Sequence, residues 1–91
     1  MKIVINRDYA GYRLNQKWAI IASHMCVDWD SITMRTHSQL IKEIETGEYD
    51  NTNLVVVTIP DKATDYEIYD YHGFESVIYV LNGKIHWAKA E

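Results

Sequence analysis

The chain has 91 residues, 47% of them hydrophobic, and a formal net charge of −4, which predicts a single domain spanning residues 1–91 around one core. The nine Lys and Arg are scattered and the apolar runs are short, which argues against double-stranded DNA as a partner and against a membrane span or a secretion signal. The single cysteine, Cys26, rules out an intramolecular disulfide and favours a reducing, cytoplasmic compartment.

The first predicted element is a strand from Lys2 to Asn6. Its three consecutive β-branched residues, Ile3 to Ile5, favour a strand buried on both faces, and we place it in the centre of the sheet. A helix with Asn15 as its N-cap is predicted from about Asn15 to Val27, because apolar residues recur there at helical spacing: Leu14, Trp18, Ile21, Ala22 and Met25. Beside this stripe we expect Cys26 to be a small buried or half-buried thiol without a catalytic role.

The next segment breaks the helix at Asp28-Trp29-Asp30-Ser31, and Ile32 to Arg35 fits a short strand or an extended connection. Thr36 and Gln39 have the spacing of a capping box, which predicts a second helix of about three turns starting there. Gly47 stands where a left-handed C-terminal cap ends such a helix. Its expected core side is Leu40, Ile41 and Ile44, and its expected water side is Lys42, Glu43 and Glu45.

The second half of the chain reads as strands. Leu54 to Ile59 is a continuous apolar run closed by Pro60, and we place it next to the first strand. Tyr66 to Tyr71 alternates as a half-exposed strand does, and His72-Gly73 turns the chain into a strand from Glu75 to Leu81. Asn82-Gly83 followed by Lys84 to Ala88 predicts a type I′ hairpin.

These elements predict an α+β fold in which two helices pack on one face of a mostly antiparallel sheet that ends in a C-terminal β-hairpin.

The turn between the first strand and the first helix holds side chains suited to ligand binding. Tyr9 and Tyr12 flank Gly11, with Arg7 and Arg13 at either end, and this mixture is able to stack on a planar ring and bind an anion. The alternative is structural: Gly11 permits a tight turn, and the two tyrosines plug the ends of the core. The residues leave both interpretations open.

Arg35 and Thr36 are a second candidate. A guanidinium just before a helix N-terminus shares an anion with the free backbone amides there, although an exposed loop arginine is the simpler explanation of Arg35. The four histidines and the pair Asp28 and Asp30 lack the spacing of a metal site. We interpret the carboxylates between Asp61 and Glu75 as a solvated strand edge. We therefore expect no metal, no cofactor and no catalysis.

The opening Lys2-Ile3-Val4-Ile5-Asn6-Arg7-Asp8-Tyr9-Ala10-Gly11-Tyr12-Arg13-Leu14-Asn15 resembles that of a family of small, mostly uncharacterised bacteriophage proteins with a K-x-V-I-N-x-C-Y/F-G-G-F-x-L-S signature. The resemblance continues through Arg35 to Leu40, Val55 to Asp61 and Asp65 to Gly73. Departures are Asp8 for the usual Cys, Ala10 for the first Gly, and His37-Ser38 for Asp-Pro. The missing Cys counts against thiol chemistry, and the hairpin Asn82 to Trp87 looks longer than the usual tail.

The resemblance implies a phage accessory protein in the host cytoplasm, a class that frequently acts against host defence. Three Trp and seven Tyr in so small a chain favour surfaces buried between subunits, so we expect a homo-oligomer. One hypothesis is that the oligomer sequesters a nucleotide-like immune signalling molecule, stacked on Tyr9 or Tyr12 and paired with Arg7, Arg13 or Arg35. The alternative is that the acidic strands from Asp65 to Glu75 inhibit a host nuclease or another host protein through its basic face.

Overall fold

The computed structural model describes residues 1–9, 11–49 and 53–89, so Ala10 and part of the polar stretch between Glu48 and Asn53 lie outside the described residues. In the first half of the described chain one strand is followed by consecutive helices, and in the second half strands follow one another. Their order is β1 (Lys2–Asn6), α1 (Gln16–His24), α2 (Ile32–Arg35), α3 (Ser38–Thr46), β2 (Leu54–Thr58), β3 (Asp65–Tyr71), β4 (Phe74–Leu81) and β5 (Lys84–Lys89). The predicted α+β class and the C-terminal hairpin are confirmed.

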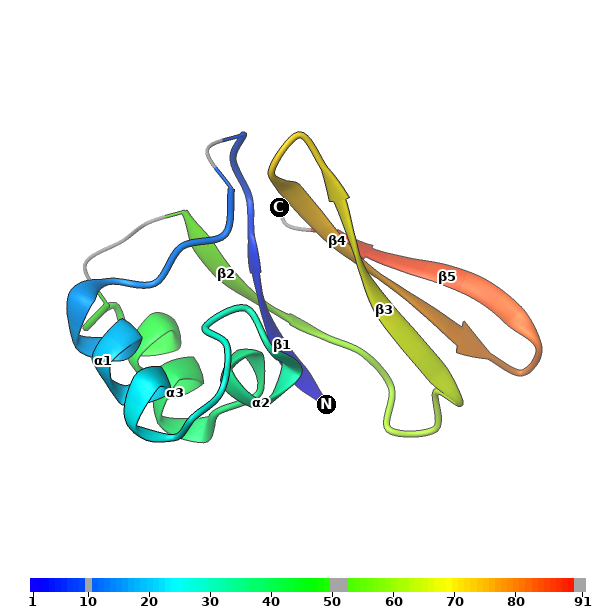
Figure 1. Ribbon diagram of the computed structural model, residues 1–91. Helices are drawn as coiled ribbons and strands as arrows, with labels where there is room; N and C mark the ends of the chain where they lie inside the picture. Colours follow the sequence, from blue (N-terminus) through cyan, green and yellow to red (C-terminus); the bar gives the residue numbers. More distant parts are fainter. Residues whose placement is uncertain (10, 50–52, 90–91) are drawn as a thin grey trace.

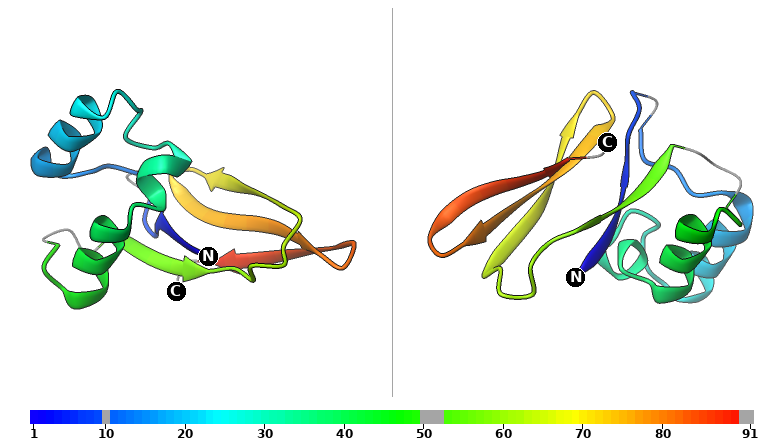
Figure 2. Two further views of the ribbon diagram at one scale, coloured as in Figure 1. Left: turned by 90° about the horizontal axis from the view of Figure 1, so that it is seen from below. Right: turned by 180° about the vertical axis from the view of Figure 1, so that it is seen from behind.

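The elements form three layers rather than two. The helices lie on one side of the antiparallel pair β1–β2, and the antiparallel sheet β3–β4–β5 lies on its other side (Figures 1 and 2). Two apolar clusters fill the two spaces between the layers. The single sheet of the prediction is thus two sheets, with β1–β2 as the middle layer.

The consecutive apolar residues of β1 match this middle position. Val4 faces the helices and packs in the cluster that holds Trp18 and Leu40, whereas Ile3 and Ile5 pack with Val77 of β4 in the other cluster. The prediction that β1 is buried on both faces is confirmed. The prediction of a central position in its sheet is wrong, because β1 pairs along one edge with β2 in a two-stranded sheet.

Helix α1 begins as the sequence predicts and ends three residues earlier. The Asn15 Oδ1 atom accepts a hydrogen bond from the Trp18 amide at 3.0 Å, which confirms the N-cap. At the other end the amides of Cys26 and Val27 donate to the carbonyls of Ser23 and Ala22, which is the Schellman pattern. Cys26 takes the left-handed position that this motif requires, at φ 57°, and it is exposed rather than buried or half-buried.

The second predicted helix is present as α3, and a further short helix precedes it. Ile32–Arg35 is the short helix α2, not a strand or an extended connection, because the Ser31 hydroxyl caps the Met34 amide at 3.3 Å. Thr36 ends α2, with its hydroxyl donating to the Ile32 carbonyl, so the predicted capping box is wrong. His37 caps α3 instead, its Nδ1 accepting from the Gln39 amide.

Two further predictions about α3 have opposite outcomes. Gly47 ends the helix in the left-handed conformation, as predicted. Glu43 was expected to face water and is buried. Its carboxylate accepts from Lys17 at 2.9 Å and from the Trp18 indole at 3.2 Å, and the hydrogen bond from Lys17 holds the Glu43 pKa below its usual value.

The turns of the β3–β4–β5 sheet have the predicted chemistry. His72-Gly73 and Asn82-Gly83 both have positive φ at their two residues, as two-residue type I′ hairpins require. The resulting register places Glu67 opposite Ile78, and Ile78 opposite Trp87.

We predict that Cys26→Gly raises the free energy of unfolding by about 1 kcal/mol, because glycine adopts the left-handed position without the clash of a Cβ with the backbone. Urea unfolding measures the change. The matched control is Cys26→Ala, which removes the thiol but keeps the Cβ and should leave stability unchanged. An equal gain from both variants would assign the effect to the thiol and contradict this explanation.

Candidate functional site

The free edge of β1 is completed by side chains. The backbone groups of Met1 and Arg7 bond to Ile59 and Asn53, which flank β2. Since backbone groups alternate along a strand, those of Val4 and Asn6 point to the opposite edge. Arg35 donates to the Val4 carbonyl at 3.1 Å, and Glu75 accepts from the Asn6 amide at 2.8 Å. An arginine of α2 and a glutamate of β4 therefore take the place of a third strand beside β1.

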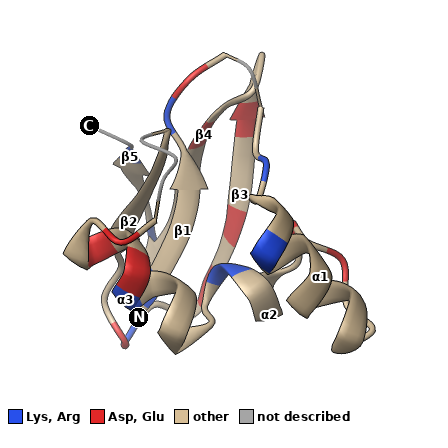
Figure 3. Cartoon of the chain, turned by 90° about the vertical axis from the view of Figure 1, so that its left-hand side faces the viewer, with Lys and Arg blue, Asp and Glu red and all other residues tan. Residues whose placement is uncertain are grey.

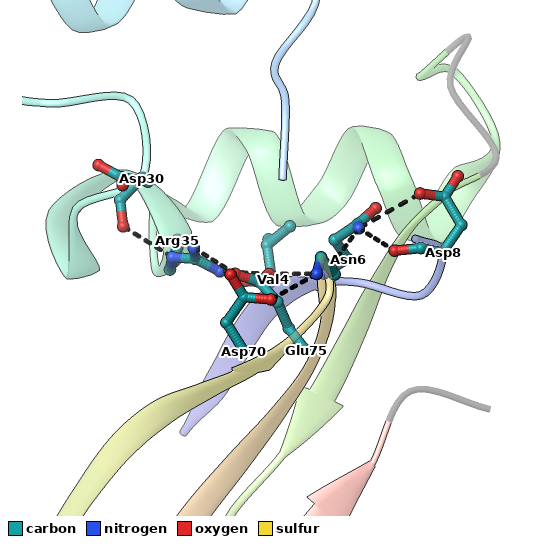
Figure 4. Close-up of polar contacts among 8 residues, drawn as sticks. Val4, Asn6, Asp8, Asp30, Arg35, Asp70 and Glu75 are labelled. Carbon is teal, nitrogen blue, oxygen red and sulfur yellow. Dashed lines mark hydrogen bonds and ion pairs between the residues drawn. The ribbon is translucent and has the colours of Figure 1, made fainter. Parts of the chain in front are cut away.

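Arg35 and Glu75 also bind each other. Two parallel hydrogen bonds of 2.9 and 2.8 Å join the guanidinium to the carboxylate, and Arg35 Nε donates to the Asp30 carbonyl at 2.7 Å (Figure 4). Both side chains are buried, with 5% and 6% of their surface exposed. Bidentate pairs of this kind are strong when every donor and acceptor has a partner.

Tyr12 covers this ion pair. The guanidinium carbon of Arg35 lies 3.8 Å from the centroid of the Tyr12 ring, the distance of a cation–π contact. Within the described part of the chain the Tyr12 hydroxyl is buried without a hydrogen-bond partner. Burial raises the pKa of this phenol far above its usual value, and the Arg35 charge offsets only part of that rise. Tyr12 therefore packs as an uncharged ring over the Arg35–Glu75 ion pair.

The turn after β1 is clamped to the β3–β4 hairpin by Asn6 and Gly73. The Asn6 side-chain amide donates to the carbonyls of Asp8 and Gly73 at 2.7 and 2.6 Å. A Cβ at Gly73 would stand 2.6 Å from the Gly11 nitrogen and 2.8 Å from the Tyr9 carbonyl oxygen, so only glycine permits this approach. The turn and the hairpin tip thus touch backbone to backbone.

The candidate residues from the sequence fall into two groups. Gly11, Tyr12 and Arg35 come together around Glu75 and Gly73, and their polar groups serve the contacts just described. The Thr36 hydroxyl is bound to α2. Arg7, Tyr9 and Arg13 lie at the surface, and the Tyr9 ring is 70% exposed with Phe74 at 5.9 Å. Arg35 is therefore not an exposed loop arginine, and its guanidinium is already paired with a carboxylate.

A different surface, on the β3–β4–β5 sheet, carries several large apolar side chains that are exposed. Alternation along the strands gives the β3–β4–β5 sheet an inner face, which holds Val77, and an outer face turned away from β1. Tyr69 and Trp87 meet edge to face on this outer face, with ring centroids 5.2 Å apart. We define the outer face as Asp65, Glu67, Tyr69, Tyr71, Ser76, Ile78, Val80, Ile85, Trp87 and Lys89.

The outer face is both apolar and open to water. Tyr69, Tyr71, Ile85 and Trp87 are 43%, 56%, 69% and 48% exposed. At one end the face is hollowed by about 250 Å³, and the hollow is lined by Asp65, Tyr66, Glu67, Ile78, Val80 and Ile85. The outer face therefore offers an aromatic surface, an aliphatic hollow and two carboxylates at one border.

Charge elsewhere on the molecule is mixed. On the side that carries the helices, Lys and Arg positions are interspersed with acidic ones (Figure 3). Among the described residues, no group of three or more His, Cys, Asp or Glu side chains is placed to hold a metal ion. No helix of the described chain has the length and apolar character needed to cross a membrane.

Comparisons with known proteins give no relative: no family model, curated protein or solved structure matches the chain.

Sequence reasoning missed two features of these sites. Glu75 was grouped with the solvated acidic edge, yet it is buried, and its alternation with the core residue Val77 on β4 was the available signal. The outer face was missed because the isolated apolar residues Ile85 and Trp87 become one surface only when the register aligns three strands.

We predict that Glu75→Leu lowers the free energy of unfolding by about 3–5 kcal/mol, because it leaves a buried guanidinium without its partner. The double variant Arg35→Met with Glu75→Leu should regain only part of the loss. The Val4 carbonyl and the Asn6 amide lose their partners in it, at about 1–3 kcal/mol each. Urea unfolding checks this, with Glu75→Gln as a milder variant if Glu75→Leu does not fold. A double variant as stable as the natural chain would contradict the edge-completing role of the pair.

Proposed function

We propose that the protein is a non-enzymatic binding protein that contacts another protein through its outer face. The observation that carries the proposal is the exposure of Tyr69, Tyr71, Ile85 and Trp87 together on one layer. A contiguous apolar patch on a small domain marks an interaction site. Tryptophan and tyrosine are also the residue types that dominate the binding energy of protein interfaces.

The composition of the face supports a protein partner over a nucleic acid. Its charged border consists of Asp65 and Glu67, with Lys89 on the opposite strand. Stacking proteins that bind single strands pair their aromatic residues with a positively charged groove, which this border does not provide. A polar rim around an apolar centre is the usual composition of a protein–protein interface.

The buried ion pair supports a structural role for the side chains that looked most reactive. Arg35, Glu75 and Tyr12 are occupied in joining α2, β1 and β4. In the context of the resemblance to phage accessory proteins, a binding protein of this kind acts against host defence by occupying a surface rather than by catalysis.

Photo-crosslinking tests the proposal. A benzophenone amino acid in place of Tyr71 should give crosslinked products in cells, and Trp87→Ser with Tyr69→Ser should reduce their yield at least tenfold, since such residues contribute about 2 kcal/mol or more each to binding. The same crosslinker at Ile20, which is 50% exposed on α1, is the matched control. Products from position 20 and none from position 71 would sink the proposal.

A second candidate function is binding of a nucleotide-like immune signalling molecule at the turn, and the 70% exposed Tyr9 ring favours it. Because Arg35 is paired with Glu75, the phosphate contacts would fall to Arg7 and Arg13. Isothermal titration against cyclic and linear nucleotides should show binding that Tyr9→Ala weakens about tenfold or more, the usual effect of losing one stacked ring. The variant keeps Phe74, the ring neighbour of Tyr9, so that a loss of binding reports on the Tyr9 ring alone. Silence across the panel would dismiss this candidate.

A further inference from the structure

We infer that the protein bound at the outer face is a second copy of this chain, packed face to face about a two-fold axis parallel to the strands. This inference rests on the proposed function, because it names the partner of the same surface. It is argued from the positions of charged and apolar residues that the strand register fixes on that face.

The register arranges the outer face in rows that cross the three strands. One row is Asp65, Val80 and Ile85; the next is Glu67, Ile78 and Trp87; the third is Tyr69, Ser76 and Lys89. In these rows the acidic residues lie on β3, the cation lies on β5, and aliphatic residues lie on β4 and at Ile85 of β5. Since both hairpins are antiparallel, β3 and β5 run in the same direction on either side of β4.

A two-fold axis that runs parallel to β4, midway between the two sheets, places β5 of the second copy over β3 of the first. Each row then lies over the same row of the other copy, and the aliphatic side chains of the two β4 strands meet at the centre. Facing sheets pack about 10 Å apart and neighbouring rows lie about 7 Å apart, distances that long side chains span. The partner's Lys89 lies over Tyr69, one row from Glu67, so symmetry forms this ion pair twice.

The other face-to-face arrangement is disfavoured by charge. A two-fold axis across the strands would lay β3, with Asp65 and Glu67, on the β3 strand of the other copy, and β5, with Lys89, on the other β5. Like charges placed across an interface oppose association. Within the part of the chain that the structure describes, neither Glu67 nor Lys89 takes part in an ion pair, so both are available for a contact between copies.

Packing of two copies also covers the surface that the single chain leaves in water. The Tyr69–Trp87 ring pair and Ile85, which is 69% exposed, flank the β4 residues at the centre and are covered in this isologous interface. A domain of this size buries a smaller fraction of its surface than a large one does, so a second copy supplies the missing cover.

Sedimentation equilibrium on the purified full chain tests the inference. The natural chain should be a dimer at micromolar concentrations, and Glu67→Lys and Lys89→Glu should each weaken the dimer at least tenfold, since each places like charges together at two symmetric positions. The double variant, with the charges exchanged, should recover to within a few-fold of the natural chain. Lys84→Glu is the matched control: it makes the same charge change on the other face of β5 and should leave the dimer intact.

Three results would overturn the inference. They are a monomer at every concentration, a dimer indifferent to both single charge reversals, or a double variant no better than the single ones. A monomer that still gives crosslinks from position 71 to a different protein, such as a host nuclease, would overturn the second copy and leave the proposed function standing. A monomer without such crosslinks would remove both.

Discussion

The pairing of Arg35 with Glu75 is the constraint on which the arrangement of the layers depends. β1 has β2 on one edge only, so its other edge leaves the Val4 carbonyl and the Asn6 amide in the interior. A buried backbone group without a partner is costly. The ion pair satisfies both groups and, in doing so, ties the helical layer to the β3–β4–β5 sheet. Without the ion pair, the Val4 carbonyl and the Asn6 amide would lose these partners.

The same requirement explains why the turn after β1 is rich in chemistry. Tyr12 shields the ion pair from water, and Asn6 fixes the turn to the hairpin tip at Gly73. Gly11 has positive φ and presents bare backbone to Gly73. Residues that suggest a ligand site in the sequence are thereby occupied with one another. Tyr9 is the exception, because its ring points out of this corner and is largely exposed.

Local signals were readable from the sequence, and signals that depend on tertiary contacts were not. The β-branched run in β1, the Asn15 cap, the Gly47 cap and the Asn82-Gly83 turn are decided by neighbours in the chain, and all are confirmed. Glu43 and Glu75 are charged residues that become buried only because Lys17 and Arg35 reach them from other elements. Thr36 does not cap α3, because its hydroxyl donates to the Ile32 carbonyl of the preceding helix α2.

Each face of the β3–β4–β5 sheet carries residues that oppose its usual polarity, and the two exceptions have different causes. The inner face is expected to be apolar, yet it holds Glu75 beside Val77, because the Asn6 amide of β1 donates to the Glu75 carboxylate. The outer face is expected to be polar, yet Ile85, Trp87 and Tyr69 are exposed to water, and no contact described within the fold accounts for their exposure. Local choices that oppose the fold persist where something else compensates for them. For Glu75 the compensation is Arg35, within the chain. For the outer face we propose that it lies outside the chain, and that face, rather than the charged interior, is the place to look for a partner.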